Sequence, residues 1–254
     1  MHDTPALQVS GLIKKFGGRR VIDNVSLTIP RGGAFGLAGP EGAGKTTLIR
    51  MVLGLTPASS GSVRVLGISV PAQRGLALGK VGAMVGEPRF HRYLTGRDNL
   101  RVLAAAREPG ADRRIESSLE RVGLRERAGD RVATYPAGLR QRLGLAACLL
   151  GDPELLILDE PARGLDPAGV LQFRQLLRGF TDEGRTVVLA TRLLAEVEPI
   201  CAAAAVLAHG RIVAQGPVGE IASAGRAGVC RAGAARVGGG RTGAGRTLAV
   251  GRAA

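Results

Sequence analysis

A nine-residue stretch, GPEGAGKTT at 39–47, combines closely spaced glycines with one lysine and two threonines. It satisfies the pattern G-x-x-x-x-G-K-[ST] through Gly39, Gly44, Lys45 and Thr46. Glycines let the backbone curl so that several N–H groups point at one phosphate, and the positive end of a following helix adds to the attraction. Lys45 can reach the β- and γ-phosphates of a nucleotide, and the Thr46 hydroxyl can ligate Mg²⁺. The stretch predicts a nucleotide phosphate site, with a glycine-rich turn and a solvated lysine as the alternative.

Two adjacent carboxylates, Asp159 and Glu160, offer a second kind of chemistry. They close the apolar stretch LLILDE at 155–160, and α/β sheets place their ligands at the carboxyl ends of such strands. Asp159 can ligate Mg²⁺ directly or through water, and Glu160 is then placed to polarise an attacking water. Alone, this pair usually marks a solvated strand end. Together with the phosphate loop it predicts nucleotide hydrolysis.

Buried strands must position these side chains, and short apolar runs alternate with helical patterns from Ala6 to about Gln215. The runs at 34–39, 155–159 and 186–190 are almost continuously apolar, which is typical of parallel strands covered on both faces. The fold class is therefore α/β. The predicted strands span 6–10, 25–29, 34–39, 62–67, 81–85, 155–159, 186–190 and 211–215.

The middle of the chain, about 87–150, has a helical pattern instead. Asp98 follows Thr95 by three positions, which resembles a capping box at the start of a helix. Apolar residues at helical spacing follow in 112–123 and 139–150. We therefore expect a helical insertion within the α/β core.

The composition limits the class of protein. Apolar residues make up 45% of the 254-residue chain, which indicates a globular fold. No apolar run approaches the roughly 18 residues that span a bilayer, and we expect no signal peptide at the N-terminus. The three cysteines, Cys148, Cys201 and Cys230, lack metal-ligand spacing and are expected to be buried thiols in a reducing cytosol.

The formal net charge of +14 is typical of chains that bind nucleic acid. However, residues 222–254 hold six arginines and no acid, in a stretch of mostly Ala, Gly and Arg without apolar periodicity. Aromatic residues for base stacking make up only 3% of the chain. We expect no nucleic-acid partner, and we expect a folded domain at 1–221 followed by a disordered tail at 222–254.

The order of several motifs makes the chain resemble the nucleotide-binding subunit of ABC transporters over about residues 6–220. The closest resemblance is to the single-domain type of bacterial drug, bacteriocin and antibiotic efflux systems. The motifs are GLIKKFGG, GPEGAGKTTLIRMVLGLTPASSGSVRVLG, VGAMVGEPRFHRYLTGRDNL, YPAGLRQRLGLAACLLGDPELLILDEPARGLDP and TVVLATRLLAEVE. The resemblance implies a P-loop NTPase core with a mostly parallel sheet and flanking helices, an antiparallel β edge and a helical insertion subdomain. It also implies ATP and Mg²⁺ as cofactors.

The resemblance assigns roles to individual residues of this chain. Glu160 and Arg192 take the catalytic positions, and Thr46 and Asp159 hold the metal ion. Phe16 matches the family's adenine-stacking aromatic, with a core phenylalanine as the equal alternative. The ATP-binding positions are Phe16, Gly39, Pro40, Glu41, Gly42, Ala43, Gly44, Lys45, Thr46, Thr47 and Asp159.

Three positions depart from the family's pattern. The Q-loop glutamine falls at Gly86, with the neighbouring Glu87 as a substitute after a register shift. The signature serine falls at Pro136, which has neither a hydroxyl nor an N–H. The switch histidine falls at Arg192, a fixed cation that can contact phosphate but cannot shuttle a proton. These departures predict slow turnover.

Two subunits of the family dimerise head to tail, so that the signature of one closes over the ATP held by the other. The resemblance places this signature at Pro136, Ala137, Gly138 and Leu139, and Asp166 in the loop that communicates across the dimer. It predicts an ATP-hydrolysing subunit, homo- or heterodimeric, that docks through about residues 86–105 on the cytoplasmic face of a separate membrane permease.

The expected function is export of a drug-like or peptide compound. Two alternatives remain at this point. The three departures favour a degenerate regulatory or decaying cassette that binds ATP with little turnover. The second alternative is a non-transport cassette ATPase that acts on nucleic acid, although such proteins usually carry extra domains or paired cassettes.

Overall fold

The structure, a computed structural model, describes residues 4–107 and 109–226 of the 254-residue chain. The described strands are β1 (Leu7–Phe16), β2 (Arg19–Ile29), β3 (Gly33–Ala38), β4 (Ser60–Val65), β5 (Ile68–Val70), β6 (Val81–Met84), β7 (Leu155–Asp159), β8 (Thr186–Thr191), β9 (Ala203–Ala208) and β10 (Arg211–Pro217). The described α-helices are α1 (Lys45–Val52), α2 (Arg74–Leu78), α3 (Gly96–Ala105), α4 (Ile115–Arg121), α5 (Ala137–Leu149), α6 (Pro167–Asp182), α7 (Leu194–Val197) and α8 (Val218–Arg226). None of these helices combines the length and the apolar character needed to cross a bilayer.

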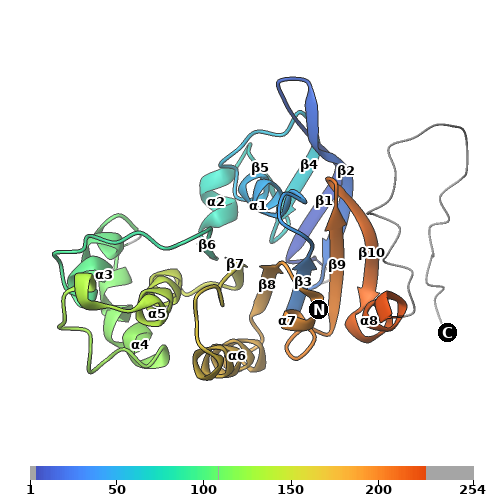
Figure 1. Ribbon diagram of the computed structural model, residues 1–254. Helices are drawn as coiled ribbons and strands as arrows, with labels where there is room; N and C mark the ends of the chain where they lie inside the picture. The colour runs from blue at the N-terminus through green and yellow to red at the C-terminus, as the bar shows by residue number, and fades with distance from the viewer. Residues whose placement is uncertain (1–3, 108, 227–254) are drawn as a thin grey trace, which may run out of the picture.

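A six-stranded sheet in the order β10-β9-β3-β8-β7-β6 forms the centre of the molecule (Figure 1). Five of its strands are parallel, and β10 pairs antiparallel with β9 at one edge. Every residue of β7 and β8 is buried, which explains why their sequences are so apolar. Because parallel strands end at the same edge of a sheet, the residues that follow β3, β7 and β8 meet there.

Four further strands form an antiparallel sheet in the order β2-β1-β4-β5. Buried and exposed residues alternate along β2, where Val25, Leu27 and Ile29 face the core. This alternation is typical of a sheet with one face in contact with water. The inward face belongs to the same hydrophobic cluster as α1 and β3. The mostly parallel core with an antiparallel β edge is thus confirmed.

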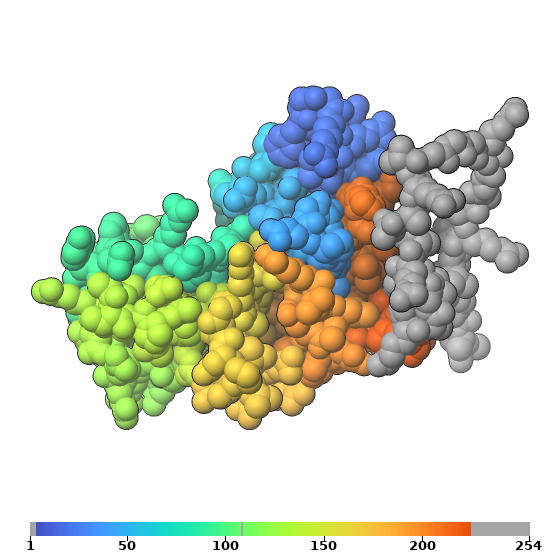
Figure 2. Space-filling model, viewed as in Figure 1, coloured from blue at the N-terminus to red at the C-terminus, as the bar shows by residue number. Residues whose placement is uncertain are grey.

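Helices α3, α4 and α5 form a lobe that projects to one side of the two sheets (Figures 1 and 2). The predicted cap is confirmed, because the Thr95 hydroxyl accepts a 3.0 Å hydrogen bond from the Asp98 N–H at the start of α3. Leu100 of α3, Leu119 of α4 and Leu143 of α5 are fully buried in one cluster. Hydrophobic packing between the three helices therefore holds the lobe together.

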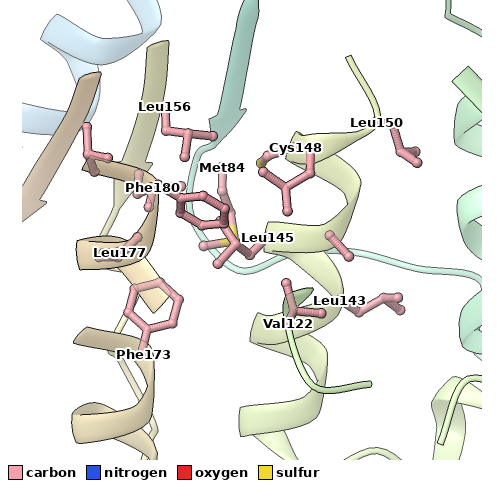
Figure 3. Close-up of a cluster of buried hydrophobic side chains, with 14 of the residues drawn as sticks. Met84, Val122, Leu143, Leu145, Cys148, Leu150, Leu156, Phe173, Leu177 and Phe180 are labelled. Atoms are coloured by element: carbon pink, nitrogen blue, oxygen red, sulfur yellow. The ribbon is translucent and has the colours of Figure 1, made fainter. Parts of the chain in front are cut away.

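Helix α5 joins this lobe to the central sheet. Figure 3 shows the Phe180 ring of α6 beside Met84 at the end of β6 and Leu145 of α5, and Leu177 of α6 belongs to the same cluster. A Cβ at Gly144 of α5 would lie only 2.7 Å from the Met84 sulfur and 3.1 Å from Pro88 Cβ. Glycine at 144 therefore permits a close contact between α5 and the segment that follows β6.

Cys148 and Cys201 are buried thiols, as the composition predicts. Burial raises the pKa of each to about 12, because removal from water disfavours the charged thiolate. Neither thiol is therefore suited to act as a nucleophile. Cys230 lies outside the described residues.

The eight predicted strands are all present, and the sequence missed two others, β5 and β9. Strand β9 reads AAAVLA, and alanine is depleted in strands generally. It is nevertheless an inner strand, because it pairs with both β3 and β10. Strands β1 and β2 are longer than predicted, because they form one hairpin whose register shifts interrupt the regular alternation.

The C-terminal boundary of the fold differs from the prediction of a domain that ends at residue 221. Helix α8 continues to Arg226, and Val218, Ile221 and Ala222 are buried. They are buried because α8 packs on β9 and β10. The rest of the predicted disordered tail, residues 227–254, lies outside the described residues, and its disorder stays a prediction.

Candidate functional site

The glycine-rich loop lies between β3 and α1, at the edge where the parallel strands end. A Cβ at Gly39 would lie 2.2 Å from the Leu207 carbonyl oxygen, so no side chain fits there. The Gly39 N–H donates a 3.1 Å hydrogen bond to the carbonyl of Thr191 at the end of β8. Helix α1 begins at Lys45, and its first-turn N–H groups therefore face the loop. This is the strand–loop–helix setting that a phosphate site requires.

Lys45 is held inside the curve of this loop. Its side chain is almost fully buried, and Nζ donates to the carbonyl oxygens of Gly39 at 2.6 Å and Pro40 at 3.2 Å. The same Nζ lies 3.7 Å from Glu160 Oε1. The alternative of a solvated lysine is therefore wrong. A phosphate that entered the loop would meet an ammonium group already in place.

Thr46 and Asp159 meet at the base of the loop. The Thr46 hydroxyl donates a 2.7 Å hydrogen bond to Asp159 Oδ2. Asp159 is buried, and its Oδ1 has no hydrogen-bond partner within the described part of the chain. A buried carboxylate oxygen without a partner, next to a hydroxyl, fits the oxygen ligands that Mg²⁺ prefers. No cluster of three or more metal-binding side chains occurs among the residues described, so nucleotide oxygens and water would complete the coordination.

Glu160 follows β7 in a left-handed conformation, with a φ of 51° that is uncommon for residues other than glycine. Its N–H donates a 2.8 Å hydrogen bond to the Ala190 carbonyl, which fixes the chain where the strand ends. Burial raises the pKa of the Glu160 carboxyl, while the charges of Lys45 and Arg192 lower it. A carboxyl that takes up a proton more readily than usual suits a general base.

Arg192 follows β8 and lies between two carboxylates. Its Nη1 is 3.1 Å from Glu41 Oε2 in the loop, and its Nε is 3.6 Å from Glu160 Oε1. The preceding Thr191 hydroxyl is hydrogen bonded to the Glu196 carboxylate. The guanidinium therefore occupies the space between the phosphate loop and the carboxylate that follows β7. No sequence pattern indicates the pair with Glu41, because the two residues are far apart in the chain.

These groups share one cavity of about 630 Å³. The predicted site residues that line it are Glu41, Gly42, Ala43, Gly44, Lys45, Thr46, Thr47, Gly86, Glu87, Ala137, Asp159, Glu160 and Arg192. Sequence reasoning missed Val21, Arg50, Arg140, Gln141, Arg163 and Gly164, which also line the cavity. Three of these are arginines whose cationic side chains add to the attraction for phosphate, and no motif spacing marked them.

The family model of ABC transporters matches residues 22–163, which include both the phosphate loop and the Asp159–Glu160 pair. The chain belongs to the ABC transporter family.

Similar proteins are ATP-binding subunits of such transporters. The chain is 43% identical over 212 residues to the uncharacterized ABC transporter ATP-binding protein YdbJ of Bacillus subtilis (strain 168), covering 83% of this chain and 69% of the relative. It is 40% identical to the Nod factor export ATP-binding protein I of Rhizobium leguminosarum bv. viciae, with 83% and 69% covered. It is 36% identical to the bacitracin transport ATP-binding protein BcrA of Enterococcus faecalis, with 85% and 70% covered.

A solved structure described as an ATP binding subunit of an ABC transporter superposes with a TM-score of 0.76 at 26% identity. The match covers 86% of this chain and 92% of that one. The P-loop NTPase fold of this ATP-binding subunit is therefore shown by structure as well as by sequence.

The segment predicted to be the signature begins at Pro136, the N-cap residue of α5. The Pro136 side chain makes no capping hydrogen bond, although its carbonyl accepts from the N–H groups of Leu139 and Arg140, both at 3.1 Å. Ala137 lines the cavity of this same chain, whereas Pro136, Gly138 and Leu139 are not among the lining residues. The start of α5 therefore lies near this subunit's own phosphate loop.

The predicted Q-loop position also reaches the cavity, because both Gly86 and Glu87 line it. Glu87 is mostly exposed, and its Oε1 lies 3.5 Å from Arg140 Nη2 at the start of α5. Glu87 thus places a carboxylate at the edge of the nucleotide cavity, where its neighbour Gly86 has no side chain.

Besides Pro136, Gly138 and Leu139, four predicted residues are not among those that line the cavity, namely Gly39 and Pro40 of the loop, Phe16 and Asp166. Phe16, at the end of β1, is 50% exposed, so the alternative of a core phenylalanine is wrong. The ring lies under Lys14, whose Nζ is 4.7 Å from the ring centroid. Asp166 caps α6, because its Oδ1 accepts a 2.7 Å hydrogen bond from the Gly169 N–H. That bond fixes the direction in which the chain enters α6.

Proposed function

We propose that this subunit hydrolyses ATP and powers a separate membrane permease that exports a drug-like or peptide compound. The observation that carries the proposal is the convergence of Lys45, Thr46, Asp159 and Glu160 on one cavity. The relatives named for bacitracin transport and Nod factor export support a role in moving such compounds.

The phosphate loop and Lys45 bind the β- and γ-phosphates, which replace the loop carbonyls as partners of the ammonium group. Thr46 and Asp159 would hold Mg²⁺, which would supply Lewis-acid stabilisation of the phosphate oxygens. Glu160 accepts the proton of the attacking water, and its burial favours proton uptake. Arg192 contacts a γ-phosphate oxygen as a fixed cation. Phe16, exposed at the end of β1, stacks on the adenine ring.

Two subunits, identical or different, dimerise head to tail in this proposal. The segment at 136–139 of one closes over the ATP of the other, and the loop around Asp166 contacts its partner. Because the Pro136 side chain offers no hydrogen bond, the N–H groups at the start of α5 supply the attraction for phosphate.

The permease docks on the surface formed by about residues 86–105. A groove of about 760 Å³ there has Phe90 and Leu103 among its lining residues. Tyr93 is 86% exposed and Val102 48% exposed nearby in the chain. A groove with exposed apolar side chains around it suits an amphipathic segment of a membrane protein. Docking places the subunit at the cytoplasmic face of the cell membrane, with no nucleic-acid partner.

A second candidate function is a degenerate cassette that binds ATP but hardly turns it over. The observation that favours it is the N-cap of α5, where no side-chain hydrogen bond forms at Pro136. The intact group of Lys45, Asp159 and Glu160 favours the first candidate instead, because each of them supports a chemical step and not binding alone.

Binding and turnover test the proposal separately. We expect Lys45→Ala to weaken binding of a fluorescent ATP analogue in the presence of Mg²⁺, because it removes the buried ammonium group. Lys80→Ala is the matched control, since Lys80 is an exposed lysine in the turn before β6. Equal binding by the wild type and Lys45→Ala would falsify the assignment of the phosphate loop.

The rate of phosphate release from ATP distinguishes the hydrolysing subunit from the degenerate cassette. We expect the wild type to release phosphate from ATP slowly and only with Mg²⁺, and Glu160→Gln to bind ATP without turnover. Removing Mg²⁺ with a chelator should stop hydrolysis in the same assay. If the wild type binds ATP and releases no phosphate even with its permease, the degenerate cassette is the correct function.

A further inference from the structure

The phosphate loop contains a negative charge of its own at Glu41. The Glu41 side chain is 78% exposed and lines the same cavity as Lys45 and Thr46. A carboxylate at this place repels the phosphates of any nucleotide that enters the loop. A loop built to bind phosphate therefore needs a neighbouring cation to offset this charge.

Arg192 is that cation, and it is shared between Glu41 and Glu160. Its Nη1 lies 3.1 Å from Glu41 and its Nε lies 3.6 Å from Glu160, which in turn lies 3.7 Å from Lys45 Nζ. Two carboxylates and two cations therefore form one chain of charges across the cavity. Glu41 draws the guanidinium toward the loop, and Glu160 draws it toward the carboxylate that serves as general base.

The Glu41–Arg192 pair is placed to break easily. Arg192 is 39% exposed and Glu41 is 78% exposed, and water screens ion pairs at such positions strongly. A γ-phosphate carries more charge than one carboxylate and offers several acceptor oxygens to a guanidinium. A γ-phosphate that enters the cavity can therefore take Arg192 away from Glu41.

We propose that Glu41 is a positioning residue that holds Arg192 over the phosphate loop and yields it to the γ-phosphate, so that the pair distinguishes ATP from ADP. The inference rests on the proposed function, because it assigns a partner to Arg192 in that same site. ADP has no γ-phosphate and leaves the ion pair closed. ATP must open the pair, because Arg192 moves from Glu41 to the γ-phosphate.

The test is a double-mutant cycle on Glu41→Gln and Arg192→Ala. Calorimetry measures the dissociation constants of ADP and of a non-hydrolysable ATP analogue for the four proteins, and phosphate release measures kcat. We expect Glu41→Gln to shift binding toward the ATP analogue relative to ADP by about 1.5- to 5-fold, the range of an exposed ion pair. We expect kcat to fall, because Arg192 without Glu41 pairs with Glu160.

Tighter ATP binding together with a lower kcat is a combination that mere distortion of the loop would not produce. In the Arg192→Ala background, Glu41→Gln removes only the direct repulsion of the phosphates, so it should shift the binding ratio less than it does in the presence of Arg192. Glu41→Asp keeps the charge and should shift the binding ratio less than Glu41→Gln does. Glu220→Gln, which removes one exposed carboxylate from α8, is the control for loss of charge alone.

Two results would overturn the inference. One is weaker binding of both nucleotides by Glu41→Gln, to the same extent, which would mean that Glu41 only shapes the loop. The other is the same shift in the binding ratio with and without Arg192, which would mean that Glu41 acts on the nucleotide directly. Both differ from failure of the proposed function, in which Lys45→Ala and the wild type bind ATP equally. The dissociation constants of ADP and of the ATP analogue show whether Glu41 acts through Arg192, even where turnover is too slow to measure.

Discussion

Pro136 is the residue that bears most directly on how fast the subunit hydrolyses ATP. A serine at the N-cap of a helix accepts a hydrogen bond from the helix backbone and keeps a hydroxyl for a ligand. The proline side chain does neither, and α5 begins here on backbone hydrogen bonds alone. The loss affects the ATP of the partner subunit, whereas Arg192 acts on the ATP of its own chain in the proposed dimer. Pairing with an intact second subunit therefore cannot restore both positions.

We expect Pro136→Ser to raise the ATPase rate of the purified subunit. One preorganised hydrogen-bond donor at a developing charge is worth about 10²–10³ in rate, which sets the upper limit of the gain. The measurement is phosphate release over a series of protein concentrations, because the site is completed by dimer formation. Ala133→Ser adds a hydroxyl to an exposed position just before α5 and should change nothing. An unchanged rate in both variants would show that the N–H groups of α5 suffice.

The sequence predicts the parts of the site that lie close together in the chain. Lys45 and Thr46 belong to one short loop, and Asp159 and Glu160 are neighbours, so their spacing carries the signal. The partnership of Arg192 with Glu41 depends on β3 and β8 lying side by side in the sheet. A long-range contact of this kind leaves no pattern in a single sequence.

At the scale of elements, α6 shows how a helix that packs on β8 and β3 shares a hydrophobic cluster with the lobe. Leu177 is fully buried in the cluster with α5 (Figure 3), whereas Leu171 on the same helix is 59% exposed. We expect Leu177→Ala to lower the free energy of unfolding by about 2–5 kcal/mol, because it leaves a cavity in the cluster. Leu171→Ala should change it by less than about 0.5 kcal/mol.

Urea denaturation of the two variants measures this difference. The same substitution on the same helix makes them a matched pair, so differences in helix propensity cancel. Similar losses in both variants would contradict the packing of α6 on α5 described above.

Element prediction succeeds where one kind of residue dominates a segment. The buried strands β7 and β8 are rich in Val, Leu and Ile, and their sequences identify them. The alanine-rich β9 is set by its place between β3 and β10, where small side chains fit, and not by its own propensity. Tertiary packing decides such a strand, which is why the sequence alone did not indicate it.

At the scale of the whole molecule, α8 is the last element of the described fold and packs on β9 and β10. We expect a chain cut after Arg226 to keep its melting temperature, because the sequence of 227–254 has no apolar face to bury. A chain cut after Pro217 should melt at a lower temperature, since it loses the buried Val218 and Ile221. Differential scanning calorimetry compares the two. A large drop for the longer chain would show that residues 227–254 contribute to the fold.

The glycine at position 144 couples the position of α5 to that of the segment after β6. The helix starts at Ala137, beside the nucleotide cavity, and rests on Met84 and Pro88 at Gly144. That contact lies about 10 Å along the helix axis from the first residue of α5. Because residue 144 has no side chain, the helix backbone packs directly against Met84 and Pro88. In the proposed assembly, a permease that displaces the segment around Pro88 would therefore also displace α5. The start of α5, with Pro136, would then move toward or away from a phosphate.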